Sequence, residues 1–273
     1  MENEIKCIGF GKDVSEILAE ISDGKFESED FCRLFEKDDI KTIEYISKGR
    51  YFELGMENKL LLDSDRNFIE NLKFNKELDS REGKNFGWKV TLVNPSTRLI
   101  SHNTISCSTK KCIENKRYPV KVAKNKDINI GNAIIHKGHL LAYDFFDCIP
   151  HVPVQFTKEK KGTKNKYNIY TQFKRANCNK KNDHGQLYFE NKVSNYLKKS
   201  DTAKIYYEVE AIFRNENDVV PMGNRIKAIS LDKTTDFKDF HVFIPNFQEI
   251  GFKDSINKDT GYKFSYAKGF EKK

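Results

Sequence analysis

The chain has 273 residues, of which 38% are hydrophobic, including 21 phenylalanines and 12 tyrosines. These residues can build the core of one large domain, or of one domain with a small addition, and no apolar stretch is long enough to span a membrane. The formal net charge of +8 favours polyanionic partners such as nucleic acids, although a lysine-rich soluble surface would give the same balance.

Residues 1–80 are expected to form a mainly helical segment. Asp13 can cap a first helix in which apolar residues recur at helical spacing, and a second short helix is expected around Phe31. A third helix is expected over residues 40–46, and residues 58–74 fit either a further helix or a strand followed by a helix. None of these residues carries chemistry, so we expect structural cover for the rest of the chain, with partner binding as the alternative.

Strands dominate the rest of the chain, so residues 81–273 are expected to form the main domain. The segment FGWKVTLVN (86–94) is typical of a strand, and the clearest strand is KIYYEVEAIF (204–213), in which apolar and polar residues alternate. One helix, at about residues 186–199, precedes the latter strand, and two further strands follow it as a meander. We therefore predict an α+β fold, in which an antiparallel sheet carries a ββα element on one side.

Six cysteines are scattered along the chain without a disulfide framework: Cys7, Cys32, Cys107, Cys112, Cys148 and Cys178. The N-terminus lacks a positive start followed by an apolar core, so the sequence predicts no signal peptide. We therefore expect reduced thiols in a cytoplasmic protein, with export by a route that needs no cleavable leader as the alternative. Cys107 and Cys112, the nearest pair, match no common zinc pattern.

Lysine and arginine residues gather on both sides of the tetrad HKGH (136–139). One basic run covers residues 108–127 and another covers residues 158–166, and a third group surrounds Asn177: Lys174, Arg175, Lys180 and Lys181. Beside a phosphodiesterase centre such runs favour a nucleic-acid partner, whereas elsewhere their usual fate is to form solvated loops.

Residues 136–190 hold four polar side chains whose types suit one reaction. His139 precedes an apolar pair, Asn168 and Asn177 lie at the two ends of a strand-like run, and Glu190 lies in a helix-like run. A histidine with an ordinary pKa takes a proton from water near neutral pH, and a hydrated Mg²⁺ needs only one or two protein oxygens. One base, two amides and one carboxylate therefore suit metal-assisted phosphodiester cleavage.

The order and spacing of these segments resemble the DNA/RNA non-specific endonucleases, which are the ββα-metal or His-Me finger nucleases, and above all their branch of bacterial DNA-entry nucleases and secreted DNases. The family's Asp-Arg-Gly-His motif is similar to residues 136–139 of this chain, and its Asn-Ile strand is similar to residues 168–177. Its Gly-Gln-x-Tyr-Tyr/Phe-Glu helix start is similar to residues 185–190, and the whole resemblance covers about residues 85–250.

The resemblance implies a Mg²⁺-dependent endonuclease, with Mn²⁺ as a substitute, that cleaves DNA and also RNA with little sequence preference. It implies that His139 is the general base and that Asn177 binds the metal through its amide oxygen. Asn168 is expected to hold the base or a metal-bound water, and Glu190 to orient a metal-bound water. Asn182 is the rival metal ligand, but the distance from Asn168 to Asn177 matches the family strand.

Two residues depart from the family motif. His136 stands where the family has Asp, and Lys137 stands where it has Arg. Lysine keeps the positive charge but loses the bidentate fork of arginine. Lys137 and Arg175 are the candidates for stabilising the charge that develops on the phosphate.

Two other classes of function use the same residues. His136, His139 and His151, with a cysteine such as Cys148, form a tolerable ligand set for a structural zinc ion. A catalytically degenerate nuclease fold would bind nucleic acid or a partner and cut nothing, but such a module has no need of the complete set of His139, two asparagines and Glu190.

A nuclease without a signal peptide endangers its own cell. Two settings therefore fit: a toxin that is exported with an immunity protein, or a defence effector that is held inactive until triggered, with residues 1–80 as the control surface. The expected partners are DNA, RNA and an inhibitory or regulatory protein. The sequence leaves these two settings open, together with that of a nuclease for nutrients or DNA uptake.

Overall fold

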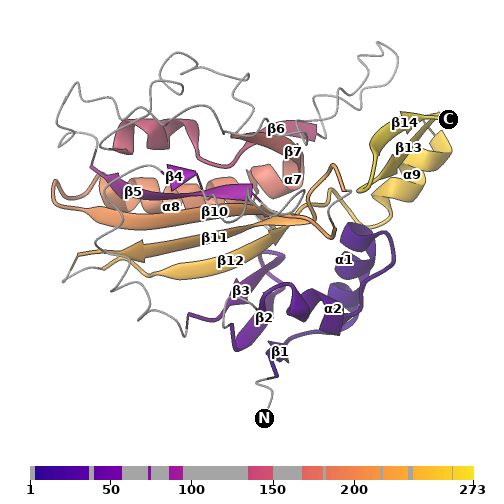
Figure 1. Cartoon of the computed structure of the whole chain (residues 1–273), viewed down its shortest axis with the longest axis horizontal. Coiled ribbons are helices and arrows are strands. Elements are labelled where there is room, and N and C mark those ends of the chain that lie inside the picture. The colour runs from indigo at the N-terminus through magenta and orange to yellow at the C-terminus, as the bar shows by residue number, and fades with distance from the viewer. Residues whose placement is uncertain are drawn as a thin grey trace.

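The core of the protein is an eight-stranded sheet (Figure 1). Its strands, in order across the sheet, are β1 (Lys6–Ile8), β2 (Thr42–Ile46), β3 (Tyr51–Leu54), β12 (Phe240–Pro245), β11 (Gly223–Ser230), β10 (Lys204–Ile212), β5 (Phe86–Val93) and β4 (Lys73–Phe74). The β1–β2 pair is parallel and every other pair is antiparallel. The structure, a computed structural model, describes residues 4–36, 40–56, 73–74, 86–94, 135–149, 168–180, 183–215, 218–232, 236–259 and 261–273.

Strand β10 lies between β5 and β11 and confirms the strand predicted over residues 204–213. Its odd-numbered residues, such as Tyr207, pack with helix α8 (Gln186–Leu197) in the main hydrophobic core. On its other face Glu208 and Glu210 are also buried, and Nη2 of Arg225 lies 2.6 Å from a carboxylate oxygen of each. The pairing makes this burial tolerable, because an unpaired buried charge would lose its hydration without compensation.

Residues 40–56 add strands to the sheet, and the residues before them form helices. Helices α1 (Lys12–Ser22) and α2 (Ser28–Arg33) confirm the first two predicted helices, although the N-cap of α1 is Gly11 and not Asp13. The third predicted helix is wrong, because residues 42–46 form β2. The isoleucines of this segment fit helical spacing. Its β-branched and aromatic side chains nevertheless favour a strand, and pairing with β3 satisfies the hydrogen bonds of its backbone.

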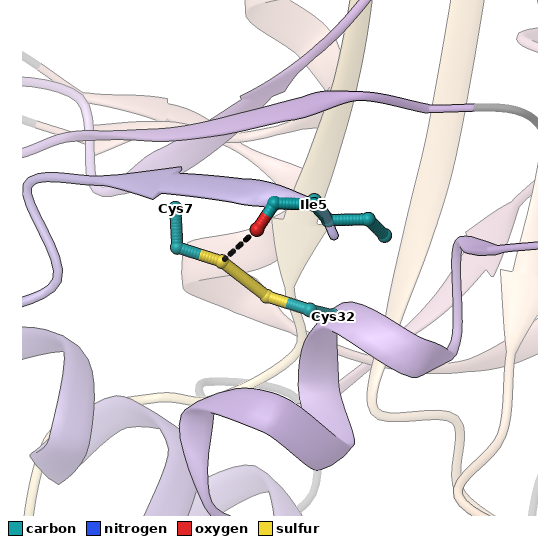
Figure 2. Close-up of a disulfide and its surroundings, with 3 residues drawn as sticks. All are labelled: Ile5, Cys7 and Cys32. Carbon is teal, nitrogen blue, oxygen red and sulfur yellow. Dashed lines mark hydrogen bonds between the residues drawn. A yellow bond between two sulfur atoms is a disulfide. The ribbon is translucent and has the colours of Figure 1, made fainter. Parts of the chain in front are cut away.

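Aromatic side chains hold this N-terminal part against the sheet. The ring centroid of Phe31 in α2 lies 4.7 Å from that of Phe52 in β3 and 5.4 Å from that of Phe243 in β12. Figure 2 shows a disulfide between Cys7 of β1 and Cys32 of α2. The expectation of reduced thiols is therefore wrong for this pair, because the fold joins two cysteines that the sequence separates by 25 residues.

The C-terminal part packs on the N-terminal part. It consists of helix α9 (Phe252–Asp259) and the hairpin of β13 (Tyr262–Ser265) and β14 (Gly269–Lys272). Lys253 donates a hydrogen bond of 2.7 Å to the carbonyl oxygen of Glu20 in α1, and Phe264 is buried in the core that α1 and α2 share. No helix among the described residues is long and apolar enough to cross a membrane.

One further layer carries the predicted motif. Strands β6 (Ile135–His139) and β7 (Ile169–Phe173) pair antiparallel, and the chain continues through helix α7 (Lys174–Asn177), the short pair of β8 (Asn179–Lys180) and β9 (Asp183–His184), and α8. The 3-10 helix η6 (Tyr143–Cys148) follows β6. In Figure 1 strands β6 and β7 lie over β5 and β10. The two strands and the helix that follows them confirm the predicted α+β fold with a ββα element.

Candidate active site

The predicted base, His139, is the last residue of β6. The register of the β6–β7 pair sets His136 opposite Gln172 and His139 opposite Ile169. His136 and His139 are three residues apart, so their side chains project to opposite faces of the strand. His139 is partly buried, and burial lowers its pKa from the ordinary value of 6.5. The ring is therefore neutral, and able to accept a proton, near neutral pH.

The chain just after His139 is fastened by Asn168. The amide of Asn168 accepts a hydrogen bond from the backbone N–H of Leu141 at 2.8 Å and donates one to the Leu141 carbonyl oxygen at 2.9 Å. The Asn168 side chain is buried, and the backbone carbonyl oxygen of Asn168 accepts a hydrogen bond from the N–H of Leu140 at 2.9 Å. Asn168 was expected to hold the base or a metal-bound water directly. In the structure both ends of its amide bind Leu141, so it acts on His139 through the backbone.

Gln186, the first residue of α8, joins the two strands of the motif to the helix. The two hydrogens of its Nε2 are shared among three acceptors, which are the carbonyl oxygens of His139 at 2.5 Å and of Leu140 at 3.0 Å and Oε1 of Glu190 at 2.7 Å. Its Oε1 accepts three hydrogen bonds of 3.1–3.2 Å, which come from Tyr170, Gln172 and Asn224. Gln186 is only 1% exposed. This side chain therefore fixes the backbone of the base and the carboxylate of Glu190 at once.

The place of Gln186 on its helix is the sequence signal that points to this role. Gln186 lies on the same helical face as Phe189, Val193 and Leu197, which are among the buried residues of α8. A glutamine on such a face has to find hydrogen-bond partners, because an unpaired buried amide costs free energy. The motif comparison marked Gln186 as part of the helix start but assigned it no role.

Glu190 lies one turn after Gln186. Burial raises its pKa to about 7, although the hydrogen bond from Gln186 lowers it, and the nearby charge of Asp144 in η6 raises it further. A carboxylate with such a pKa changes its charge near the pH at which a nuclease would work.

Gly185 brings the end of α7 against the start of α8. A Cβ atom on Gly185 would fall 2.7 Å from the carbonyl oxygens of Arg175 and Ala176, and closer still to that of Cys178. Real Cβ atoms do not approach backbone oxygens this closely, so a glycine is required here. The segment that carries Asn177 is therefore pressed against the residue that precedes Gln186.

Asn177, the predicted metal ligand, is the last residue of α7. Its Nδ2 lies 2.8 Å from Nδ1 of His136, and Sγ of Cys178 lies 3.9 Å from the same ring nitrogen. Burial, and next the charge of Lys174, lower the pKa of His136 from 6.5. Among the described residues no donor binds Oδ1 of Asn177. A partly exposed amide oxygen without a protein donor suits Mg²⁺, which prefers oxygen ligands and keeps several waters.

Arg175 is engaged inside the protein. Its Nη2 lies 3.0 Å from Oδ1 of Asp183, its Nε donates to the same oxygen at 3.1 Å, and its guanidinium lies 4.0 Å from the ring centroid of Phe247. The side chain is only 5% exposed. A phosphate role for Arg175 would require this pair to open, so the structure assigns it to holding α7 against β9.

Several predicted features lie outside the described residues: Asn182, Lys181, His151, Cys107, Cys112 and the basic runs 108–127 and 158–166. The backbone of Lys137 pairs with Thr171, but its side chain is also outside the described set. The zinc interpretation stays a prediction, because His151 of its ligand set lies outside the described residues. The described part of the chain holds no group of three metal-binding His, Cys, Asp or Glu side chains.

The fold and the candidate site together are those of a nuclease of the ββα class. The chain belongs to the DNA/RNA non-specific endonuclease family, whose sequence profile matches residues 71–268. The predicted resemblance is thus confirmed, and the family implies a nucleic acid as substrate. No curated protein matches the chain.

Solved structures show the same fold. NucA from Streptococcus agalactiae with magnesium ion bound is 22% identical, with a TM-score of 0.52 over 90% of this chain and 98% of that chain. The same protein with no metal bound is 21% identical, with a TM-score of 0.52 over 90% of this chain and 97% of that chain. A more distant likeness is to the Sda1 nuclease with bound zinc ion, at 15% identity and a TM-score of 0.41 over 73% and 79% of the two chains.

Proposed function

We propose that the chain hydrolyses internal phosphodiester bonds of DNA, and also of RNA, with a hydrated Mg²⁺ and little sequence preference. The observation that carries this proposal is the arrangement around Gln186. This residue binds the backbone of His139 at 2.5 Å and follows Gly185, which packs on the end of α7 beside Asn177. The strand that ends at the assigned base, His139, and the helix that ends at the assigned metal ligand, Asn177, therefore both meet the chain at Gly185 and Gln186.

His139 removes the proton of the attacking water, and its lowered pKa keeps the ring neutral for this task. Asn177 would hold the cation through Oδ1, and Mn²⁺ would substitute for Mg²⁺ there. A bound cation neutralises charge on the scissile phosphate and on the departing 3′-oxygen. Glu190, held by Gln186, would orient water beside the cation, and Asn168 keeps the chain after His139 in place.

Phosphate contacts come from the basic residues. We assign them to Lys137 and to the runs 108–127 and 158–166, because these cations flank the motif in the sequence. Contacts with the phosphate backbone carry no sequence information, which accounts for the low sequence preference. Arg175 instead keeps α7 in position through Asp183.

The test is digestion of supercoiled plasmid by purified protein with Mg²⁺, Mn²⁺ or EDTA. We expect cleavage with either cation, and a fall of about 10²–10⁴ in rate for His139→Ala with unchanged binding to short duplex DNA. His184→Ala is the matched control. Burial lowers the pKa of His184 as it does for His139, but the His184 ring stacks on Tyr188 with centroids 3.7 Å apart.

Three outcomes would contradict the proposal. If plasmid stays intact with folded protein and with either cation, the remaining interpretation is a module that binds nucleic acid without cleaving it. An active His139→Ala variant removes His139 from the mechanism. A His139→Ala variant that unfolds and releases stoichiometric zinc supports the structural zinc site.

The Cys7–Cys32 disulfide favours the exported setting over the cytoplasmic one, because disulfides persist in oxidising compartments. We therefore propose that the protein leaves the cell, which fits a toxin and does not fit an intracellular defence effector. Mass spectrometry of protein from the culture medium, after thiol alkylation without reductant, would show Cys7 and Cys32 blocked and Cys178 modified. Protein found only in the cell, with Cys7 alkylated, would contradict this.

A further inference from the structure

His136 replaces the aspartate of the family motif, and the structure gives it a specific contact. Its Nδ1 lies 2.8 Å from Nδ2 of Asn177. An amide nitrogen only donates, so this contact is a hydrogen bond in the tautomer of His136 that carries its hydrogen on Nε2 and leaves Nδ1 as the acceptor. We propose that His136 is a positioning residue, which turns the amide of Asn177 so that its oxygen, and not its nitrogen, is offered to the cation. This inference rests on the proposed function.

The orientation of the amide matters because the two ends of an asparagine side chain have nearly the same shape. A half-turn about the last side-chain bond exchanges the oxygen and the nitrogen, and only the oxygen binds a cation. With Nδ1 of His136 as an acceptor, the turned amide would set two acceptors against each other. In the tautomer that leaves Nδ1 as an acceptor, the hydrogen bond therefore favours the orientation that offers the oxygen to the metal.

A second contact with the same ring nitrogen supplies a control. Sγ of Cys178 lies 3.9 Å from Nδ1 of His136, and Cys178 is the neighbour of Asn177 in the chain. A thiol is a weak donor, and this distance is long even for sulfur. Cys178→Ala removes that contact and keeps Asn177, so it should leave the amide orientation unchanged.

Two substitutions separate the acceptor of His136 from its ring. His136→Phe keeps a planar ring of similar size and has no acceptor. His136→Asp loses the ring but places an acceptor the same number of bonds from Cβ as Nδ1, and it restores the residue of the family motif. The proposal predicts opposite results for the two variants, whereas a role in packing alone predicts that Phe is the better replacement.

The experiment is a titration of metal-free protein with Mn²⁺, followed by calorimetry and by electron paramagnetic resonance, without nucleic acid. We expect His136→Phe to raise the Mn²⁺ dissociation constant by roughly 10–100-fold, which is the usual effect of losing a partner that orients a metal ligand. His136→Asp and Cys178→Ala should stay within about twofold of the natural protein. In an Asn177→Ala background, His136→Phe should add less than about twofold, because the two residues act as one unit.

The outcomes separate this inference from the proposed function. The role of His136 would be overturned if His136→Phe bound Mn²⁺ as tightly as the natural protein does. It would also be overturned if His136→Phe and His136→Asp lost equal Mn²⁺ affinity. Unchanged affinity in Asn177→Ala would overturn the metal site itself, whatever His136 does. Thermal unfolding of each variant shows whether it is folded, and His136→Leu, which also lacks an acceptor, replaces His136→Phe if that variant is not.

Discussion

The N-terminal part and the motif layer are both buried, but by opposite means. Around Phe31 the interior consists of aromatic rings in contact, whereas around Gln186 it consists of amides that bind one another and the backbone. Apolar burial stabilises without further conditions, while polar burial costs free energy unless every group is paired. The motif layer therefore keeps polar groups inside that fix the backbone of His139 and the side chain of Glu190, whereas the N-terminal part supplies stability.

The largest expected effect tests the apolar side of this comparison. Phe31 is fully buried and contacts the rings of Phe35, Phe52 and Phe243. We expect Phe31→Ala to lower the free energy of unfolding by about 3–5 kcal/mol. Urea unfolding measures this loss, and the plasmid-cleavage rate per folded molecule should not change. A large fall in that rate would mean that the N-terminal part shapes the site.

Gln186→Met tests the polar side. Methionine fills the same space but removes the oxygen that accepts from the hydroxyl of Tyr170 and from the amides of Gln172 and Asn224, and Gln172 keeps only its 3.5 Å contact with Oδ1 of Asn224. We expect the cleavage rate to fall by about 10²-fold, because the base and Glu190 lose their common support. Stability should fall by roughly 1–3 kcal/mol.

Asn246→Leu is the matched control for Gln186→Met. Asn246 is another buried amide, which donates to the carbonyl oxygens of Thr171 and Pro221 and accepts from the N–H of Phe173. None of the Asn246 side-chain hydrogen bonds reaches His139 or Glu190. The Asn246→Leu variant should therefore lose stability and keep its cleavage rate. Equal losses of rate in the two variants would show that the network around Gln186 is structural only.

A smaller difference separates the two candidate metal ligands. Asn177→Ala should lower the apparent affinity for Mg²⁺ in the cleavage assay by about 10–100-fold, and Asn182→Ala should lower it less. Asn182 lies outside the described residues, and the motif spacing from Asn168 favours Asn177. Titration of the rate with Mg²⁺ decides between them, and a greater loss in Asn182→Ala would reverse the assignment.

The smallest effect is on the pH dependence. Burial raises the pKa of Glu190 to about 7 and lowers that of His139, so Glu190 is the group that gains a proton first as the pH falls. We expect the rate of the natural protein to fall below about pH 7. Glu190→Gln should be slower but should show no such fall until the pH is below 6.5, where His139 becomes protonated. An unchanged acid limb in the rate profile would exclude Glu190 as its cause.

The same pKa shift has a consequence for stability. The folded-state pKa of Glu190 lies above its ordinary value of 4.5, so the folded protein binds this proton more tightly than the unfolded chain does. That stabilisation is complete below pH 4.5 and is lost as the pH rises through about 7. Glu190→Gln should therefore raise the melting temperature relative to the natural protein at pH 8 and not at pH 4, which calorimetry at both values measures.

The sequence determined the features that depend on neighbours along the chain. Alternation of apolar and polar residues predicted β10, helical spacing predicted α1 and α2, and the motif spacing predicted the family and the ββα element. The same local reasoning failed at residues 40–46, because isoleucines at helical spacing also fit a strand once β3 lies beside them. The catalytic roles of His139, Asn177 and Glu190 stay predictions.

Only the tertiary structure decided the features that join distant segments. It paired Cys7 with Cys32, placed Asn177 against His136 and bound Gln186 to the carbonyl oxygen of His139. It also withdrew Arg175 into a pair with Asp183 under the ring of Phe247. Hydrogen bonds and ion pairs act only over a few ångströms, so the partner of a buried polar group is known only after the fold has brought the two segments together.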